Sequence, residues 1–165
     1  MNGMFIRAMR RLDAGARSSL QVIHITGIKD YDWAVKEYDG SGVSARVYSC
    51  IDRIEEAYSA SDLVGTRSGA SAIFELAFFG RPMVLIPYPF AMSHQSENAR
   101  VFAERGAAVK IEEKDLSADI LIDTLSGLFN NRARLKNMAE RAKDLSAPEA
   151  SENLAEMVFE LAGKD

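Results

Sequence analysis

The segment between residues 63 and 86 constrains the fold of this chain more than any other. It opens with an apolar run at 63–66, breaks at Ser68-Gly69, continues with helical spacing from Ala70, and ends in a second apolar run at 83–86. This spacing predicts a strand, a glycine turn, a helix and a second strand. Two strands joined through a helix are typical of a parallel sheet with helices packed on it.

The glycine turn in this segment also predicts an anion site. A helix that begins at the carboxyl end of a parallel strand points its free N–H groups and its dipole at a ligand. Glu75 lies about one and a half turns into the helix, and its apolar neighbours predict a buried or cleft position. Phosphates on the N–H groups and ribose hydroxyls on Glu75 would suit a nucleotide. An ordinary helix cap at Ser68-Gly69 and an ordinary first-turn acid at Glu75 are the alternative interpretations.

The same alternation of strands and helices extends over the whole chain. Strands are expected at 20–25, 45–48, 63–66, 83–86 and 107–111, and helices at 4–12, 31–38, 51–58, 70–80, 94–105, 117–129, 132–145 and 150–162. The pattern predicts one α/β domain over residues 1–165, a Rossmann-like doubly wound parallel sheet, with residues 146–165 forming a C-terminal helix that packs outside the core sheet. Such domains normally open with a strand, whereas this chain opens with a helical pattern, so a first strand is expected to be missing.

Charge argues against a dedicated nucleic-acid binder, because the formal net charge is −4 and the isoelectric point is near 5.3. Basic residues do gather near the start of the chain, at Arg7, Arg10, Arg11 and Arg17. A solvated helix face is the favoured interpretation of this cluster. Contact with an acidic lipid or a phosphate is the alternative.

The single cysteine, Cys50, excludes an internal disulfide and indicates a reducing compartment. We interpret Cys50, and likewise Phe78 and Phe79, as core residues. The two histidines and the cysteine lie far apart, so neither a metal site nor a cofactor is predicted. His24, at the end of a predicted strand, is interpreted as a structural histidine. No apolar run approaches the length of about 20 residues that a membrane span needs, and no signal peptide is recognised, so a cytoplasmic location is expected.

Several spaced motifs resemble one known family. They are Arg67-Ser68-Gly69-Ala70, Glu75, Gly80-Arg81-Pro82, Ile86-Pro87 and His94-Gln95-Ser96-Glu97-Asn98-Ala99. In this order they resemble the C-terminal half of the MurG family, bacterial transferases that add N-acetylglucosamine to a lipid-linked muramoyl-pentapeptide to give lipid II. The resemblance implies a GT-B fold, whose C-terminal domain holds the donor UDP-N-acetylglucosamine.

The resemblance assigns donor-binding roles to individual residues. It implies uracil contact by the backbone of Ile51, diphosphate contact by Ala70, Ser71 and Ala72, ribose binding by Glu75, recognition of the N-acetylglucosamine by His94 and Gln95, and support of the site by Ser68, Gly69 and Asn98. Ala72 stands where the family often has Thr, so one hydroxyl contact to phosphate is absent. No catalytic residue is assigned, because the catalytic base belongs to the N-terminal acceptor domain, which this chain lacks.

The expected function is therefore that of a donor-binding domain, inactive alone, from an inverting N-acetylglucosaminyltransferase of peptidoglycan synthesis. Two alternatives stay open: a donor-binding subunit of a split glycosyltransferase, and an enzyme similar to UDP-sugar 2-epimerases. The missing acceptor half is expected as a partner, either as a domain or as a separate subunit. Contact with the inner face of the plasma membrane is expected only through that half. Open edges of the strands at 20–25 and 63–66 predict self-association.

Overall fold

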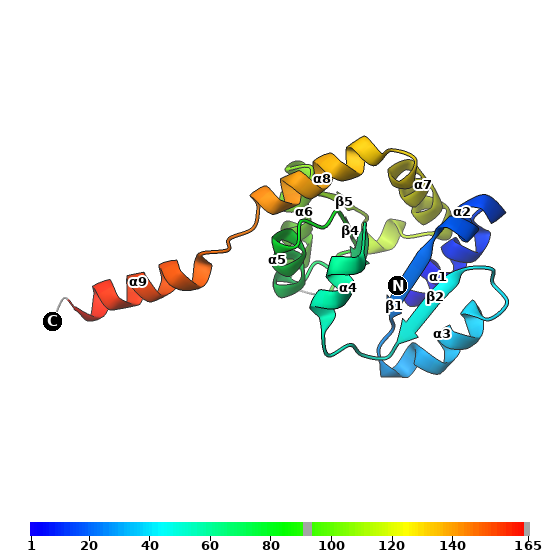
Figure 1. The fold of residues 1–165 in the computed structure, drawn as a ribbon, viewed down its shortest axis with the longest axis horizontal. Helices are drawn as coiled ribbons and strands as arrows, with labels where there is room; N and C mark the ends of the chain where they lie inside the picture. The colour runs from blue at the N-terminus through cyan, green and yellow to red at the C-terminus, as the bar shows by residue number, and fades with distance from the viewer. Residues whose placement is uncertain (91–93, 164–165) are drawn as a thin grey trace. The chain divides into compact units, whose positions relative to one another are not determined.

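The computed structural model describes residues 1–90 and 94–163 and divides into two compact units (Figure 1). The first unit comprises Met1–Ser61 and Ile111–Leu135, and the second comprises Asp62–Lys110 and Lys136–Asp165. In both units the strands are parallel and are connected through helices. The predicted α/β class is therefore confirmed.

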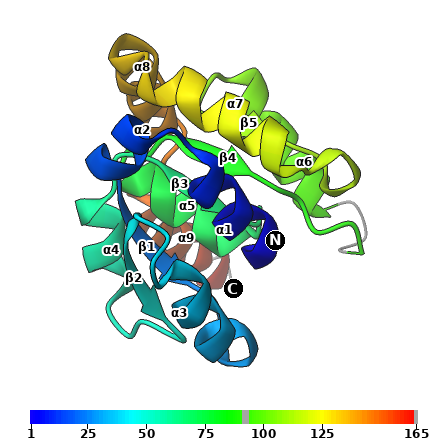
Figure 2. The ribbon, with the colours of Figure 1, turned by 90° about the vertical axis from the view of Figure 1, so that its right-hand side faces the viewer.

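The first unit is built around a two-stranded parallel sheet. Its elements are α1 (Asn2–Arg11), α2 (Ala14–Ser19), β1 (Gln21–Ile25), η1 (Ile28–Asp30), α3 (Tyr31–Tyr38), β2 (Ser44–Tyr48), α4 (Ile54–Ala60), η2 (Glu113–Asp115) and α7 (Ala118–Phe129). β1 and β2 run side by side, with Val22 opposite Ala45 (Figure 2). Helices α1 and α3 contribute Ile6, Ala34 and Tyr38 to a core cluster beside this sheet.

Local sequence explains the two helices that open the chain. In α1, Ile6 and Met9 lie one turn apart and are both buried, as the apolar spacing predicts. The six-residue α2 was not expected, since it contains no apolar period. It begins at Asp13, whose side chain accepts a hydrogen bond of 2.9 Å from the Ala16 N–H.

The second unit contains a three-stranded parallel sheet in the order β3-β4-β5. Its elements are β3 (Val64–Thr66), α5 (Ala70–Phe78), β4 (Met83–Leu85), α6 (His94–Glu104), β5 (Ala108–Lys110) and α9 (Ala150–Ala162), and α8 (Arg132–Asp144) lies mostly within it. All three residues of β4 are buried, because the strand is central and both its faces are covered.

Gly80 ends α5 and directs the chain into β4. It adopts a φ of +60°, a conformation that side chains with a Cβ rarely take. The Gly80 N–H donates to the carbonyl of Ala77, and the Arg81 N–H donates to the carbonyl of Leu76 at 2.8 Å. These two bonds form a Schellman motif, so Gly80 has a definite backbone role at the end of α5.

The parallel strands form two separate sheets rather than one. Among the described residues, β1 pairs only with β2, and β3 pairs only with β4. β1 and β3, the two strands whose edges the sequence predicts to be open, are thus each edge strands of their own sheet.

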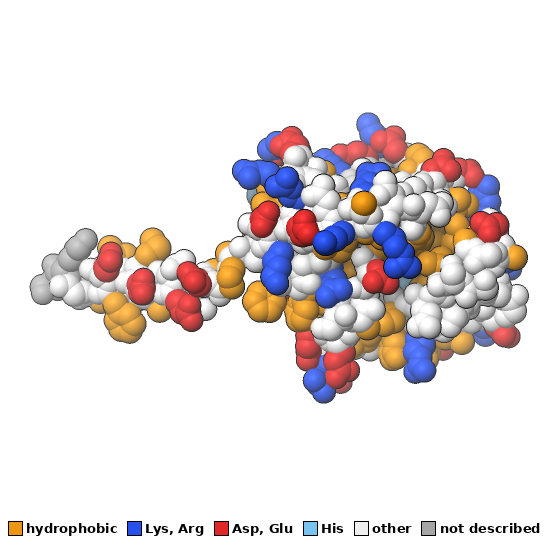
Figure 3. Space-filling view, turned by 45° about the horizontal axis from the view of Figure 1, so that its top comes forward, with side chains coloured by type: hydrophobic (Ala, Val, Ile, Leu, Met, Phe, Trp, Pro, Cys, Tyr) orange, Lys and Arg blue, Asp and Glu red, His pale blue; other side chains and the backbone are white. Residues whose placement is uncertain are grey.

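Helix α9 contributes no buried residue among those described. Its apolar side chains Leu154, Met157, Val158, Phe159 and Leu161 are 55–76% exposed. On the face drawn in Figure 3, hydrophobic side chains lie beside acidic ones along this helix. None of the described helices is long and apolar enough to cross a membrane.

Two expected core residues are on the surface. Cys50 is exposed in the segment between β2 and α4, where the chain has left the sheet. Phe78 is 57% exposed, because each helical residue is rotated by about 100° from the last and Ile73, Leu76 and Ala77 already occupy the buried face of α5. The expected helix at 51–58 begins at Ile54 instead.

Candidate donor-nucleotide site

The amino end of α5 lies directly after the carboxyl end of β3, as the glycine turn predicts. Gly69 occupies the cap position in an extended conformation, and no side chain caps the helix. Among the described residues, the N–H groups of Ala70, Ser71 and Ala72 have no acceptor. Because these groups carry the positive end of the helix dipole, the geometry suits an anion such as a phosphate.

Ser68 does not cap α5 but joins it to α6. Its side chain is fully buried, and its hydroxyl donates to the Gln95 carbonyl at 2.7 Å. The Asn98 amide donates back to the Ser68 carbonyl at 3.1 Å. This pair of bonds, called the Ser68 clasp below, rules out the alternative in which Ser68 is an ordinary cap. Asn98 therefore bonds to the backbone of the glycine turn, and its support of a donor site stays a prediction.

The loop after β4 is hydrogen-bonded to Gln95 and to Arg67. Its Tyr88 N–H donates to the side-chain oxygen of Gln95 at 2.9 Å. Arg67 donates to the carbonyls of Ile86 and Pro87, each at 3.2 Å, and its guanidinium lies 5.4 Å from the Tyr88 ring centre. The sequence predicts no role for Arg67, although a charged residue directly before a glycine turn was an available signal.

The remaining predicted site residues lie on α5 and α6 or in the first unit. Glu75 is exposed and belongs to the outward face of α5, so a buried position is ruled out, whereas a cleft position stays a prediction. His94 is exposed at the first residue of α6. Ile51 is half-buried and belongs to the first unit, so its meeting with the α5 residues stays a prediction. Among the residues described, no three His, Cys, Asp or Glu side chains gather in a way that could hold a metal ion.

A buried polar cluster lies at β1 in the first unit. Asn2 donates its amide to the Thr26 carbonyl at 2.9 Å and to Asp30 at 2.8 Å, which leaves its oxygen facing His24 Nε2 at 3.4 Å. His24 Nε2 therefore carries the proton, and Nδ1 accepts from the Tyr38 hydroxyl at 2.9 Å.

Burial also sets the charge states in this cluster. It lowers the pKa of His24, an effect that Asp30 partly opposes. It also raises the pKa of Tyr38. Both groups are thus neutral and hydrogen-bonded, which matches the interpretation of His24 as a structural histidine.

Comparison with known proteins identifies the family. Residues 4–154 match the glycosyltransferase family 28 C-terminal domain. The chain belongs to this family. The match covers both units and the whole candidate site.

Named relatives support the more specific resemblance to the MurG family. The chain is 38% identical over 99% of its length to the UDP-N-acetylglucosamine–N-acetylmuramyl-(pentapeptide) pyrophosphoryl-undecaprenol N-acetylglucosamine transferase of Burkholderia cenocepacia (strain HI2424). It is 41% identical over 91% of its length to the transferase of the same name from Nitratidesulfovibrio vulgaris (strain DP4). The crystal structure of Acinetobacter baumannii MurG superposes with a TM-score of 0.87 at 26% identity, over 96% of this chain. The predicted resemblance and the GT-B type of fold are confirmed.

These relatives are much longer than this chain. The matched region is 45% of the Burkholderia protein, 42% of the Nitratidesulfovibrio protein and 45% of the Acinetobacter chain. The chain therefore spans about half the length of the relatives it matches, and its similarity concerns one half of a transferase.

Proposed function

We propose that this chain binds the donor UDP-N-acetylglucosamine for an inverting glycosyltransferase of peptidoglycan synthesis. The observation that carries the proposal is the uncapped amino end of α5, held at the carboxyl end of β3 by the Ser68 clasp. Ligands of open α/β sheets bind at this edge of the sheet. The names of the relatives supply the donor sugar and the pathway.

Each part of the donor has a candidate partner. The N–H groups of Ala70, Ser71 and Ala72 would hold the diphosphate and stabilise the charge that develops as UDP leaves. Glu75, exposed on the same helix, would accept hydrogen bonds from the ribose hydroxyls. The uracil would meet the backbone at Ile51.

Sugar recognition would fall to the first residues of α6. The oxygen of the Gln95 side chain already accepts from the Tyr88 N–H, so its amide nitrogen is the group left to donate to a sugar hydroxyl. The exposed His94 beside it can donate or accept. The base that takes the proton of the attacking hydroxyl would come from the acceptor half, so we expect this chain alone to be inactive.

Calorimetry with UDP at high protein concentration tests the proposal. Charged hydrogen bonds to the ribose hydroxyls are each worth roughly 1.5–3 kcal/mol, so Glu75→Ala should weaken UDP binding about tenfold to a hundredfold. Glu75→Gln should be intermediate because it keeps one acceptor. Glu160→Ala, on the exposed α9, is the matched control and should bind as the wild type does.

Three results would contradict the proposal. One is the absence of heat and of any chemical-shift change at α5 with millimolar UDP. Another is equal binding by Glu75→Ala and wild type. The third is conversion of UDP-N-acetylglucosamine to an epimer by this chain alone, which would instead support the epimerase alternative.

A further inference from the structure

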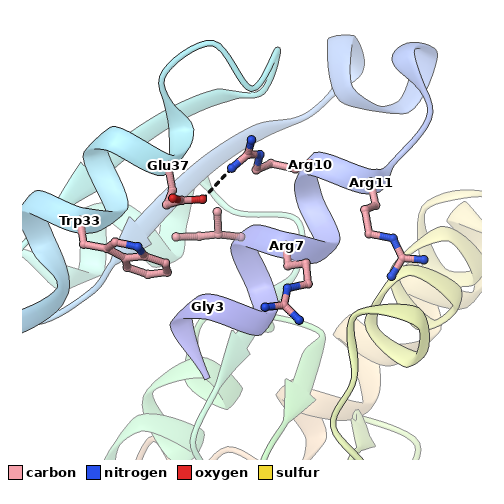
Figure 4. A pocket seen from close by; sticks show the side chains of 7 residues that line it. Gly3, Arg7, Arg10, Arg11, Trp33 and Glu37 are labelled. Carbon is pink, nitrogen blue, oxygen red and sulfur yellow. Dashed lines mark hydrogen bonds and ion pairs between the residues drawn. The ribbon is translucent and has the colours of Figure 1, made fainter.

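A hollow in the first unit gathers positive charge around a tryptophan. It encloses about 370 Å³ between α1 and α3 and is lined by Gly3, Ile6, Arg7, Arg10, Arg11, Trp33 and Glu37 (Figure 4). We call it the Arg7–Trp33 groove. All its residues belong to the first unit, so it is separate from the α5 site in the second unit.

The charges of the groove are only partly neutralised by protein partners. Arg10 pairs with Glu37 at 2.6 Å, and Arg11 pairs with Asp119 of α7 at 2.5 Å. Arg7 makes no hydrogen bond or ion pair with any residue that the structure describes. Figure 4 shows Arg10 pointing toward Glu37, whereas Arg7 and Arg11 point away from it. With Arg10 and Arg11 each paired to a carboxylate, the charge of Arg7 leaves the groove positive, in a chain whose net charge is −4.

The apolar part of the groove is also ordered by the fold. Ile6 is 1% exposed and forms its floor. Trp33 is 43% exposed, and its ring lies close to Gly3, since a Cβ placed on Gly3 would be 3.5 Å from the ring. The indole therefore lies at van der Waals distance from α1 at Gly3.

From this combination we infer that the Arg7–Trp33 groove binds a phosphate-bearing anion. A guanidinium presents paired donors that match phosphate oxygens, and Arg7 is the group with donors to spare. The exposed indole offers an apolar surface to whatever adjoins the phosphate. The volume is at the small end of the range for ligand pockets, which suits a phosphate with one attached group. That phosphate can be free in solution or part of a lipid headgroup.

The groove contains its own probe, because Trp33 is the single tryptophan of the chain. We would titrate the 165-residue chain with inorganic phosphate against sodium chloride at matched ionic strength and follow the Trp33 emission. A second series would use phosphatidylcholine vesicles with and without phosphatidylglycerol. Saturation by inorganic phosphate indicates a free anion, and a response confined to the anionic vesicles indicates a lipid headgroup.

Variants decide whether the response comes from the groove. Arg7→Gln should weaken binding about tenfold, the scale of one charged hydrogen bond, and Arg7→Lys should weaken it less. Arg46→Gln removes an equal charge from an exposed position of β2 outside the groove lining and should leave the response unchanged. Glu75→Ala should also leave it unchanged, which separates this inference from the proposed donor site.

Two results would overturn the inference. One is the absence of a saturable change in Trp33 emission with either probe. The other is an equal response in Arg7→Gln and wild type, after circular dichroism has confirmed that both are folded.

Discussion

The Ser68 clasp should be a main source of order at the donor site, and Ser68→Ala tests it. The substitution removes a hydroxyl that is fully buried and donates at 2.7 Å to the Gln95 carbonyl, 27 residues away. It removes one hydrogen bond to a carbonyl that lies in the first turn of α6, and it creates almost no cavity. The net loss of such a hydrogen bond is roughly 0.5–1.5 kcal/mol of unfolding free energy.

Urea unfolding followed by circular dichroism measures this cost. With a slope of roughly 2 kcal/mol per molar urea, a loss of about 1 kcal/mol lowers the midpoint by about 0.5 M. Ser71→Ala is the matched control, because Ser71 is exposed in the first turn of α5 and its hydroxyl makes no hydrogen bond with the described residues. We expect the control to change the unfolding free energy by less than about 0.5 kcal/mol.

A second substitution tests whether the two hydrogen bonds of the Ser68 clasp depend on each other. Asn98→Ala removes the 3.1 Å bond to the Ser68 carbonyl and should cost about 1 kcal/mol. Because both bonds hold the same loop, the double variant should lose less than the sum of the single losses. Equal midpoints for Ser68→Ala and Ser71→Ala would refute the reasoning, as would exact additivity of the two clasp variants.

Three further predictions concern the rest of the chain. Burial lowers the folded-state pKa of His24, so the unfolded chain binds more protons at low pH than the folded chain does. The unfolding free energy should therefore fall as the pH drops from about 7 to about 5, as measured by urea melts at each pH. His24→Gln should reduce this dependence on pH, whereas the control His94→Gln should leave it unchanged. Gly80→Ala forces a Cβ into a φ of +60° and should cost about 1–2 kcal/mol in the same assay, whereas Gly127→Ala, in the interior of α7 with open space beside it, should stabilise by up to about 1 kcal/mol. Deletion of residues 150–165, which include no described buried side chain, should change the unfolding free energy by less than about 0.5 kcal/mol. If the deletion lowered the unfolding free energy as much as Gly80→Ala does, that result would contradict the exposure of α9.

Periodic apolar residues made most of the fold predictable. The five strands and the longer helices follow patterns of burial that residue spacing reveals, and Gly80 marks a turn that only glycine fits well. The short α2 lacked such a pattern because it depends on the single cap at Asp13. Phe78 was misplaced because the buried face of α5 is already occupied by Ile73, Leu76 and Ala77, and the 100° step per residue turns Phe78 away from it.

The site was predictable where its geometry is local and unpredictable where it depends on contacts between distant segments. The glycine turn and the helix that follows are contiguous, so the position of the uncapped N–H groups could be read from the chain. The bonds of Arg67 to the loop after β4 join residues 19 and 20 positions apart, and no spacing rule predicts them. The exposure of Glu75 depends on which face of α5 the sheet covers, a tertiary property that its apolar neighbours concealed.

The division of the strands into two sheets bears directly on how a nucleotide would be held. The amino end of α5, where we propose that the phosphates bind, is held within its own unit by Ser68, Gln95 and Asn98. Ile51, the proposed uracil contact, is fixed within the other unit, whose strand β1 pairs only with β2 among the described residues. On the proposed assignment, phosphate affinity would depend on bonds inside the second unit, whereas base selectivity would depend on a residue of the first unit. Ile51 substitutions would then weaken UDP binding and leave pyrophosphate binding unchanged, so a comparison of these two ligands separates the contributions.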